Sequence, residues 1–330
     1  EATGQTTGNN IPYLKDNRHE IAKEFDITLD ELSEIIEASR QKLFEVREKR
    51  IHPLKDDKIL TDWNGLMIAA FSLGGQILNE PEYTKAAEQA ARFVYKKLRN
   101  KNGRLMKRYR LGKAGLSPHL DDYSFLVWGF LNLYEGTFNV DYLSKAIELT
   151  KIMNEDFSDE NGGFFIGSKN AEKLMVRAKD SYDSAIPSGN SVAVMNLYRL
   201  SKMTSNKIWT ELADKTLKAF TDQAKQAPTG FAHMFTGFMF DIKDSKEVVI
   251  VANSYDSTTE ELIQKIRANY SPNKVVLFKD LSGSKKIEKI APWISAHSVI
   301  DNKPTFYVCE DFTCKRPTTN IETVLNYLSE

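Results

Sequence analysis

Cysteine is scarce in this sequence: Cys309 and Cys314 are the only two among 330 residues. A protein of this size held together by disulfides would normally have more, so a disulfide framework is excluded and a reducing, cytoplasmic location is favoured. The Cys-x4-Cys spacing lacks the second pair of ligands that a structural zinc site needs. We expect two free thiols, at least one buried as a small hydrophobic residue, with a redox pair or half of a metal site as the alternatives.

Neither sign of charge is in excess, because 45 lysine and arginine residues balance 45 aspartate and glutamate residues. This balance gives no electrostatic footprint for nucleic acid or for an anionic membrane surface. The short basic stretch at 107–110 is interpreted as solvated surface. No apolar run approaches the roughly 18 residues of a membrane span. Neither nucleic acid nor a membrane is therefore an expected partner.

Histidine is also rare, and the 5 histidines form no His-x-His or His-Glu-x-x-His pair. We therefore expect no metal site and no cofactor. The sequence also lacks a nucleophile elbow, a phosphate-binding loop and a dinucleotide-binding glycine fingerprint. The first ten residues are polar and contain no apolar segment of a secretory signal. They are typical of an interdomain linker, which indicates that a longer polypeptide has been cut.

What the sequence does contain is a repeat of about 60 residues. Asp62 and Asp122 lie 60 residues apart, and Ser188 follows Asp122 after 66. Each stands where a polar loop runs into an apolar helix. A spacing of this size indicates a repeat architecture, in which the three loops lie on one rim.

Each repeat combines an apolar helix with an amphipathic one. The apolar helices are expected at 63–78, 123–138, 192–203 and 231–240, and the amphipathic ones at 82–99, 141–157 and 208–225. A further helix is expected at 28–50, opened by a capping box of Thr28 and Glu31. Helices that are apolar all round are buried on every side, so the pattern predicts an inner ring surrounded by an outer ring. This is an all-α, α/α toroid, and it is incomplete because a full toroid of this kind has six hairpins.

Strand patterns appear in two other places. A β-hairpin is expected around 164–176. Near residue 244 the pattern changes to a strand at 247–252, a helix at 258–268, strands at 274–278 and 305–309, and a last helix at 318–328. Strands separated by a helix predict a small α/β module with a parallel pair. The predicted organisation is a linker over 1–19, a partial toroid over 20–243 and the module over 244–330.

Several of these segments carry a family resemblance. The stretch Asp-Asp-Lys-Ile-Leu-Thr-Asp-Trp-Asn-Gly-Leu at 56–66 resembles the most distinctive segment of the YyaL-like, thioredoxin-domain-containing proteins, a family that includes the spermatogenesis-associated thioredoxin-like protein. His-Leu-Asp-Asp-Tyr at 119–123, Ile-Pro-Ser-Gly-Asn-Ser at 186–191 and the two cysteine segments within 307–317 resemble its further landmarks. The resemblance covers roughly residues 9–328.

The resemblance implies a toroid similar to six-hairpin glycosidases and N-acylglucosamine 2-epimerases, preceded by a thioredoxin-like domain. The sequence departs from the family pattern in two ways, because it has no Cys-x-x-Cys and no counterpart of the first toroid hairpins. It therefore resembles the C-terminal half of the family. A thioredoxin-like domain of a longer polypeptide is accordingly an expected partner.

The rim loops carry more carboxylates than helix capping requires. Asp62, Asp122 and Ser188 could each simply accept a hydrogen bond from a first-turn amide. The extra carboxylate of Asp121 and two loop histidines beside prolines instead suit general acid/base chemistry on a sugar, although a loop histidine can also brace its loop. The predicted catalytic residues are Asp62, Asp122, His119, His52 and Asp121.

Aromatic and amide side chains stand next to these carboxylates. Rings at a polar mouth can stack on pyranoses, or they can pack between the inner helices. The predicted substrate-binding residues are Trp63, Tyr123, Asn64, Tyr182, Asn190 and His233. Trp128 is assigned to the core, and Gly65 and Gly189 are expected to allow close approach of helices.

Two functions are compatible with this pattern. The leading hypothesis is a carbohydrate-active or carbohydrate-binding toroid with epimerase/isomerase-like or glycosidase-like acid/base chemistry, with a sugar as its ligand. The alternative is a non-catalytic helical scaffold that serves a thioredoxin-like domain, in which the carboxylates only cap helices.

Overall fold

The structure, a computed structural model, describes residues 13–172, 175–243 and 245–329. The chain divides into two compact units, Glu1–Asp57 and Lys58–Glu330. Residues 1–12 of the predicted linker lie outside the described residues. The predicted boundaries at 19/20 and 243/244 stay predictions.

The described part of the first unit, residues 13–57, contains two helices, α1 (Arg18–Glu24) and α2 (Leu29–Glu48). The predicted capping box opens α2: the Glu31 amide donates to Thr28 Oγ1 at 3.2 Å, and the Thr28 amide donates to Glu31 Oε2 at 2.8 Å. These two bonds satisfy amides that have no partner within the helix.

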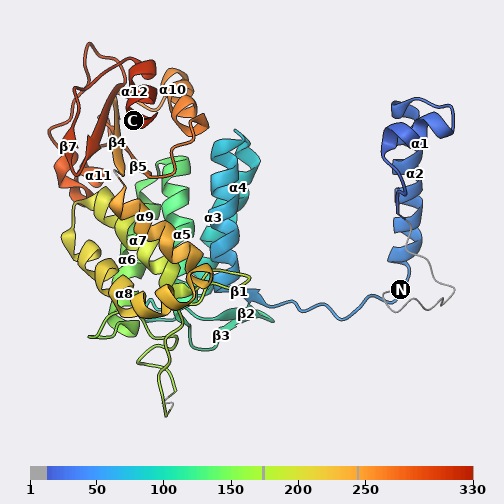
Figure 1. Cartoon of the computed structure of the whole chain (residues 1–330), viewed down its shortest axis with the longest axis horizontal. Helices are drawn as coiled ribbons and strands as arrows, with labels where there is room; N and C mark the ends of the chain where they lie inside the picture. Colours follow the sequence, from blue (N-terminus) through green and yellow to red (C-terminus); the bar gives the residue numbers. More distant parts are fainter. Residues whose placement is uncertain (1–12, 173–174, 244, 330) are drawn as a thin grey trace. The chain divides into compact units, whose positions relative to one another are not determined.

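The second unit is built on helical hairpins (Figure 1). Its apolar helices are α3 (Thr61–Ile77), α5 (Leu120–Thr137), α7 (Gly189–Thr204) and α9 (Ala232–Ile242), and its outer helices are α4 (Pro81–Lys97), α6 (Val140–Phe157) and α8 (Lys207–Gln226). Contacts run from α3 to α5, from α5 to α7 and from α7 to α9, and each of the first three inner helices packs against the outer helix that follows it. The second unit is therefore an incomplete α/α toroid, and the predicted neighbours α3 and α5 do lie side by side.

The two ends of the inner row differ from its middle. Helix α5 is buried on nearly all sides, as its sequence predicts. On α3, the apolar side chains of Met67, Leu73 and Ile77 are exposed, and several on α9 are as well. The prediction that every all-apolar helix is buried all round is therefore wrong for α3 and α9, because each end helix has an inner neighbour on one side only in the described second unit.

Glycine lets α3 and α5 approach closely. A Cβ on Gly65 would lie 2.5 Å from the backbone carbon of Phe125, and one on Gly129 would lie 3.0 Å from the carbonyl oxygen of Gly65. Gly189, at the start of α7, has the Asp121 carboxylate only 2.3 Å from the position of a Cβ. The predicted role of Gly65 and Gly189 in close packing is confirmed.

The small module contains a four-stranded sheet in the order β5-β4-β6-β7. Its strands are β4 (Lys246–Ala252), β5 (Lys274–Asp280), β6 (Thr305–Glu310) and β7 (Thr313–Cys314). Its helices are α10 (Ser257–Ala268), α11 (Lys285–Ile290) and α12 (Ile321–Ser329). Strands β4 and β5 form the predicted parallel pair, joined through α10, and β6 pairs antiparallel with β4.

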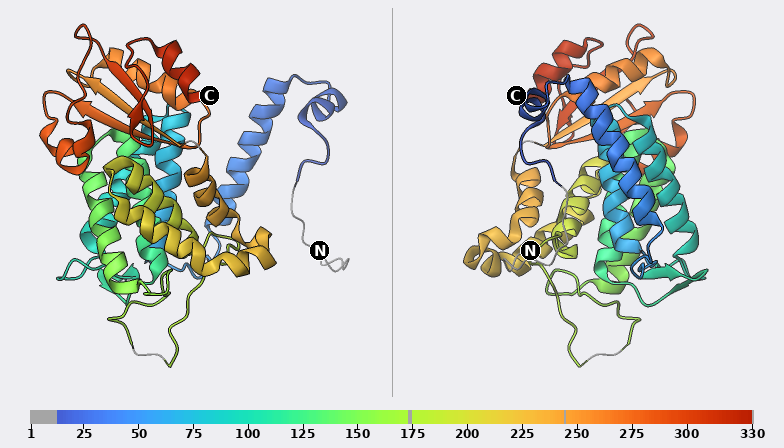
Figure 2. Two further views of the ribbon diagram at one scale, coloured as in Figure 1. Left: turned by 60° about the vertical axis from the view of Figure 1, so that its left-hand side comes forward. Right: turned by 90° about the vertical axis from the view of Figure 1, so that its right-hand side faces the viewer.

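The module covers the C-terminal ends of the inner helices (Figure 2). The ring of Phe138, which follows α5, lies 5.3 Å from that of Phe278 on β5. Arg267 of α10 donates to the carbonyls of Glu135 and Gly136 at 2.8 and 2.9 Å. One continuous hydrophobic core runs through the helices and the sheet.

The N-terminal ends of the inner helices form the opposite rim. There a small antiparallel sheet joins β1 (Ile59–Leu60), β2 (Arg108–Arg110) and β3 (Lys113–Gly115). The predicted hairpin around 164–176 includes residues 173–174, which lie outside the described residues. Its described part has isolated bridges, Ser158 with Phe164 and His119 with Gly167, in place of regular strands.

The two cysteines are joined, so the prediction of free thiols is wrong. Cys309 and Cys314 lie opposite each other on β6 and β7, with their Cα atoms 3.8 Å apart and a disulfide between them. A pair five residues apart meets in this way because a two-residue turn reverses the chain between them, which the composition does not reveal. Cys309 is fully buried, as expected of one of the two.

Candidate functional site

The rim is organised by a buried carboxylate that serves two helices. Asp122 lies in the first turn of α5, where its Oδ2 accepts from the His119 amide at 2.8 Å. Its Oδ1 accepts from the Asp62 amide at 3.0 Å, at the start of α3. Asp122 therefore caps the neighbouring helix as well as its own, and it has no exposed surface from which to contact a ligand.

Lys107 completes this cluster from the segment that precedes β2. Its Nζ donates to Asp62 Oδ2 at 2.5 Å and to Asp122 Oδ1 at 3.3 Å. The interpretation of 107–110 as solvated surface is wrong for Lys107, whose side chain is largely buried. Burial opposes its charge, yet Asp122 and Asp62 together raise the pKa of Lys107. This ion-pair cluster joins the starts of α3 and α5.

The pKa values of the rim acids are shifted upwards. Burial raises the pKa of Asp122 to about 7 against the opposing Lys107. Burial also raises that of Asp121 to about 6, again against Lys107, and the charge of Asp62 adds to the effect. Burial and Lys107 both lower the pKa of His119. Three titratable groups at the rim are thus shifted towards their neutral forms near neutral pH, as is common at functional sites.

Asp121 and Asp183 extend these contacts to the starts of α7 and α9. The Asp121 carboxylate lies against Gly189 at the start of α7. Asp183 accepts from the Ser188 amide at 2.9 Å and from the His233 amide at 2.8 Å, at the start of α9. Ser188 itself caps its own helix by accepting from the Ser191 amide. Asp183 was not predicted, and the only signal for it is an acid shortly before a helix start.

The predicted aromatic residues separate into exposed and buried ones. Trp63 is 61% exposed, and Tyr182 is exposed with its ring edge against Phe231. Tyr123 is fully buried, its hydroxyl accepting from the Leu105 amide at 2.9 Å and its ring packing against Phe157. Tyr123 therefore cannot stack on a sugar, because no face of its ring is open.

The predicted amides are held by the backbone. Asn190 is buried, accepts from the Phe164 amide at 2.8 Å and donates to the carbonyls of Phe164 and Asp180 at 2.9 and 2.7 Å. Asn64 donates to the Leu60 carbonyl at 2.8 Å. Asn190 fixes two loops to the start of α7, which corrects its assignment to ligand binding.

The two other histidines predicted for the site, His52 and His233, have different surroundings. His52 belongs to the first unit, where it is exposed with Nε2 3.2 Å from the Glu48 carbonyl. Its assignment to the site stays a prediction. His233, in the first turn of α9, lies with its ring 5.1 Å from that of Trp128. Burial lowers the pKa of His233.

His233 and Trp128 line a cavity of about 500 Å³ along the inner wall. The assignment of Trp128 to the core is wrong, because the ring is only partly buried and opens into this cavity. Deeper in the cavity, Arg199 donates to Asn132 Oδ1 at 2.9 Å and to Glu135 Oε2 at 2.7 Å. The floor is formed by residues of α10 and β5.

Asp121 shares one face of α5 with residues of the cavity. Trp128, Asn132 and Glu135 follow Asp121 by 7, 11 and 14 residues, spacings that return to the same side of a helix. Asp121 is half-buried although most of α5 is fully buried. Seven residues rise about 10 Å along the axis, so Asp121 stands two turns above Trp128 on the same stripe of α5.

In the described residues, one cluster could hold a metal ion, and it lies in the module: His297, Cys309 and Cys314. The rim carboxylates form no such cluster in the part of the chain that the structure describes. No helix in that part is both long and apolar enough to cross a membrane.

These features define an incomplete α/α toroid with an acidic rim and a groove along its inner wall, the cavity lined by Trp128 and His233. A family model described as glycosyl hydrolase family 47 matches residues 126–281. Among solved structures, the GH76 alpha-mannanase from Bacteroides thetaiotaomicron is 16% identical and shares 66% of this chain and 60% of its own at a TM-score of 0.48. The cellobiose 2-epimerase from Spirochaeta thermophila is 15% identical over 49% of this chain and 43% of its own, with a TM-score of 0.43.

The curated relatives match nearly the whole chain. Spermatogenesis-associated protein 20 from Homo sapiens is 30% identical over 329 residues, which are 96% of this chain and 42% of that protein. The uncharacterized protein B0495.5 from Caenorhabditis elegans is 30% identical over 315 residues, 92% of this chain and 42% of that protein. The resemblance to the spermatogenesis-associated family is confirmed, and the chain spans less than half the length of the curated relatives it matches.

Proposed function

We propose that this chain is a carbohydrate-active toroid whose ligand lies along the stripe of α5 that carries Asp121 and Trp128. The observation that carries the proposal is the stripe itself: a half-buried acid at its upper end, and Trp128, Asn132 and Glu135 lining a cavity below it. A partly apolar cavity with a few convergent polar groups is the usual form of a small-molecule site. The match of residues 126–281 to a glycosyl hydrolase model supports a sugar as the ligand.

Asp121 and His119 are the proposed acid and base. With a pKa raised to about 6, Asp121 keeps its proton closer to neutral pH than an ordinary aspartate does, which suits a general acid. With its pKa lowered, His119 is neutral at the same pH and can accept a proton. Opposite roles for two neighbouring groups suit epimerase/isomerase-like or glycosidase-like chemistry. Asp122 anchors the backbone of His119 by accepting from its amide, and Lys107 joins Asp122 to Asp62.

Trp128 and His233 are the proposed ring-binding residues within the groove, with Trp63 as an exposed platform at the rim. Aromatic faces stack on the apolar side of a pyranose. The Arg199–Glu135 pair at 2.7 Å and the neighbouring Asn132 amide offer donors and acceptors to hydroxyl groups. The distance of about 10 Å from Asp121 to the level of Trp128 fits a ligand of two or three sugar units.

A sugar panel measured by thermal shift tests this function on the full chain. We expect at least one pyranose or short oligosaccharide to raise the melting temperature by about 5 °C at saturation. Asp121→Asn and Trp128→Ala should abolish that shift, whereas Asp222→Asn and Tyr83→Ala on the outer helices should leave it intact. Absence of any shift across the panel, or a shift that survives both groove variants, would reject the proposal.

The alternative function, a non-catalytic scaffold for a thioredoxin-like domain, is favoured by a different observation. Asp122 and Asp183 each cap a neighbouring helix and Asp121 lies against the start of α7, so contacts to helix ends alone account for these carboxylates. A scaffold predicts that rim variants lower stability with no sugar binding to lose. The same thermal-shift series therefore separates the two functions.

A further inference from the structure

The disulfide of the module lies at an exposed hairpin end. Cys309 and Cys314 flank a two-residue turn, Asp311 and Phe312, which have positive φ angles of 47° and 63°. A turn of this kind prefers Asn-Gly, because most side chains disfavour the left-handed region. Cys309 is fully buried, whereas Cys314 lies on the short edge strand β7 and is exposed.

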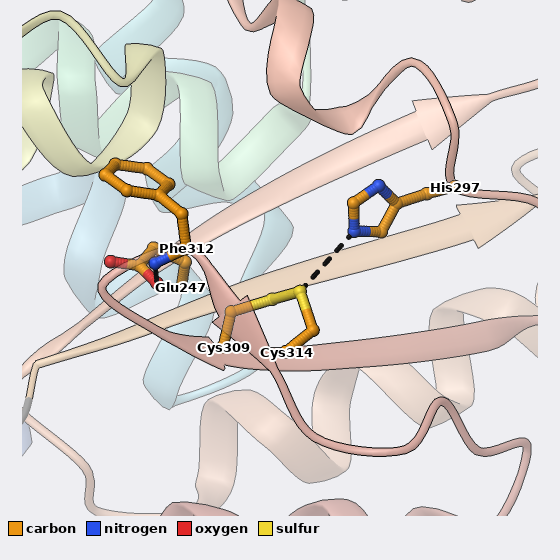
Figure 3. The surroundings of a disulfide bond; sticks show 5 residues. All are labelled: Glu247, His297, Cys309, Phe312 and Cys314. Atoms are coloured by element: carbon orange, nitrogen blue, oxygen red, sulfur yellow. Dashed lines mark hydrogen bonds between the residues drawn. A yellow bond between two sulfur atoms is a disulfide. The ribbon is translucent and has the colours of Figure 1, made fainter.

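An imidazole faces the exposed sulfur (Figure 3). His297 Nε2 lies 3.7 Å from Cys314 Sγ, within hydrogen-bonding reach of sulfur. In the described structure the other ring nitrogen, Nδ1, is buried without a hydrogen-bond partner. This pattern places the ring proton on Nε2, where it points at Cys314. Burial lowers the pKa of His297, which keeps the ring in this neutral form.

The loop that carries His297 is held from two sides. Lys279, buried on β5, donates to the carbonyls of Ser295 and His297 at 2.7 and 2.9 Å. The Tyr307 hydroxyl accepts from the Ser298 amide at 3.1 Å and donates to the Ser298 carbonyl at 2.8 Å, and its ring lies 4.1 Å from the imidazole. A buried ammonium is costly unless several acceptors surround it. These contacts fix the imidazole beside the disulfide.

We propose that Cys309–Cys314 is an exchangeable disulfide that reacts with an external dithiol, with Cys314 as the attacked sulfur and His297 as the group that stabilises the Cys314 thiolate. This site is separate from the sugar groove and does not depend on the proposed function. The alternatives of a redox pair and half of a metal site follow from the sequence, and the geometry favours the redox pair.

The proposed reaction consists of two successive thiol–disulfide exchange steps. A thiolate of the dithiol attacks Cys314 Sγ, forming a mixed disulfide as the Cys309–Cys314 bond breaks, and Cys309 leaves as a thiolate that takes a proton from water. The second thiolate of the dithiol then attacks the first sulfur of the same dithiol, which is bonded to Cys314 in the mixed disulfide. Cys314 leaves with the electron pair, next to the Nε2–H of His297. The dithiol ends as a disulfide and the chain gains two thiols. A hydrogen bond to a leaving thiolate speeds its departure.

Differential alkylation of the folded full chain, with dithiothreitol as the dithiol, tests the redox step. We expect two thiols to appear together with the helical circular dichroism unchanged. If the thiols appear only after the helical signal is lost, the disulfide is structural and the proposal is wrong. If the reduced chain binds one zinc ion that protects both thiols from alkylation, the site is a metal site and the proposal is equally wrong.

Single-cysteine variants test the roles of the two sulfurs and of His297. In Cys309→Ser, Cys314 should react with an aromatic disulfide reagent at least about tenfold faster than Cys309 does in Cys314→Ser. Adding His297→Asn to Cys309→Ser should slow that reaction about tenfold, and Tyr307→Phe should slow it less because the imidazole remains. The matched control His19→Asn should have no effect. Equal rates for the two cysteines, or no effect of His297→Asn, would overturn the assignment.

Discussion

At the level of single residues, the rim is held by carboxylates that serve a helix other than their own. Asp122 accepts from the start of α3 and Asp183 from the start of α9, and the Asp121 carboxylate lies against the start of α7. Asp122 and Asp183 each satisfy a first-turn amide that has no partner within its helix, and all three place a carboxylate at the positive end of a neighbouring helix dipole. Burial at these contacts raises the pKa of Asp121 and Asp122. The contacts to neighbouring helices and the raised pKa values thus share one physical origin.

The raised pKa of Asp121 predicts a pH dependence of stability. The folded chain holds this proton up to about pH 6, whereas an ordinary aspartate loses it near 3.8. The folded state therefore binds more protons between these values, so its stability is greatest at low pH and falls as the pH rises through this window. Asp121→Asn removes the ionisation. Its stability relative to the parent should increase from pH 4 to pH 7 by on the order of 2 kcal/mol.

Urea denaturation of the parent and of Asp121→Asn at pH 4, 5, 6 and 7 measures this difference. Asp222→Asn, an exposed aspartate on α8, is the control and should show no such trend. If the stability of Asp121→Asn relative to the parent does not change with pH, the raised pKa of Asp121 is contradicted. If that relative stability falls as the pH rises, the pKa of Asp121 is lowered in the folded chain and not raised.

At the level of elements, the close contact of α3 and α5 depends on glycine, and Gly65 is the most tightly packed position. A Cβ at Gly65 would lie 2.5 Å from the Phe125 backbone, where no side chain can move aside. Gly65→Ala should therefore force the helices apart and lower the free energy of unfolding by about 3 kcal/mol. Gly74→Ala on the same helix meets only Tyr83 at 3.6 Å. It should be neutral or stabilising by up to about 1 kcal/mol.

Chemical denaturation of these two variants is a matched comparison on one helix. Equal effects would show that helix propensity, and not the α3–α5 contact, decides the outcome. A Gly65→Ala chain as stable as the parent would contradict the packing described here.

The elements themselves were largely predictable from the sequence. Helical periodicity and the Thr28–Glu31 capping box placed the helices within a few residues, because hydrophobic spacing and first-turn chemistry are local properties. The partners of side chains were not predictable in the same way. Lys107 sits in a basic stretch that suggests solvent, and only the meeting of Asp62 and Asp122 in space explains its burial. The apolar pattern of its helix predicts that Trp128 belongs to the core, yet the ring opens into the cavity between helices far apart in the sequence.

At the level of the whole second unit, the helices and the sheet share one core. The sheet closes the C-terminal ends of the inner helices through Phe138, Phe278 and Arg267, opposite the rim. The composition change near residue 244 predicted a separate module but could not show that its apolar surface is completed by α5 and α7. The shared core makes the floor of the cavity part of the module, so the helices that line the cavity and the module should unfold together.

Phe278→Ala tests this coupling. The side chain is buried between Phe138 and Tyr255, and removing it should cost about 3–5 kcal/mol. Because the core is continuous, we expect hydrogen exchange of peptides from α5 and from β4 to accelerate by the same factor. The control Tyr270→Ala removes an exposed ring and should change neither. Faster exchange confined to the strands would show that the module opens alone and that the boundary predicted at 243/244 separates two independent folding units.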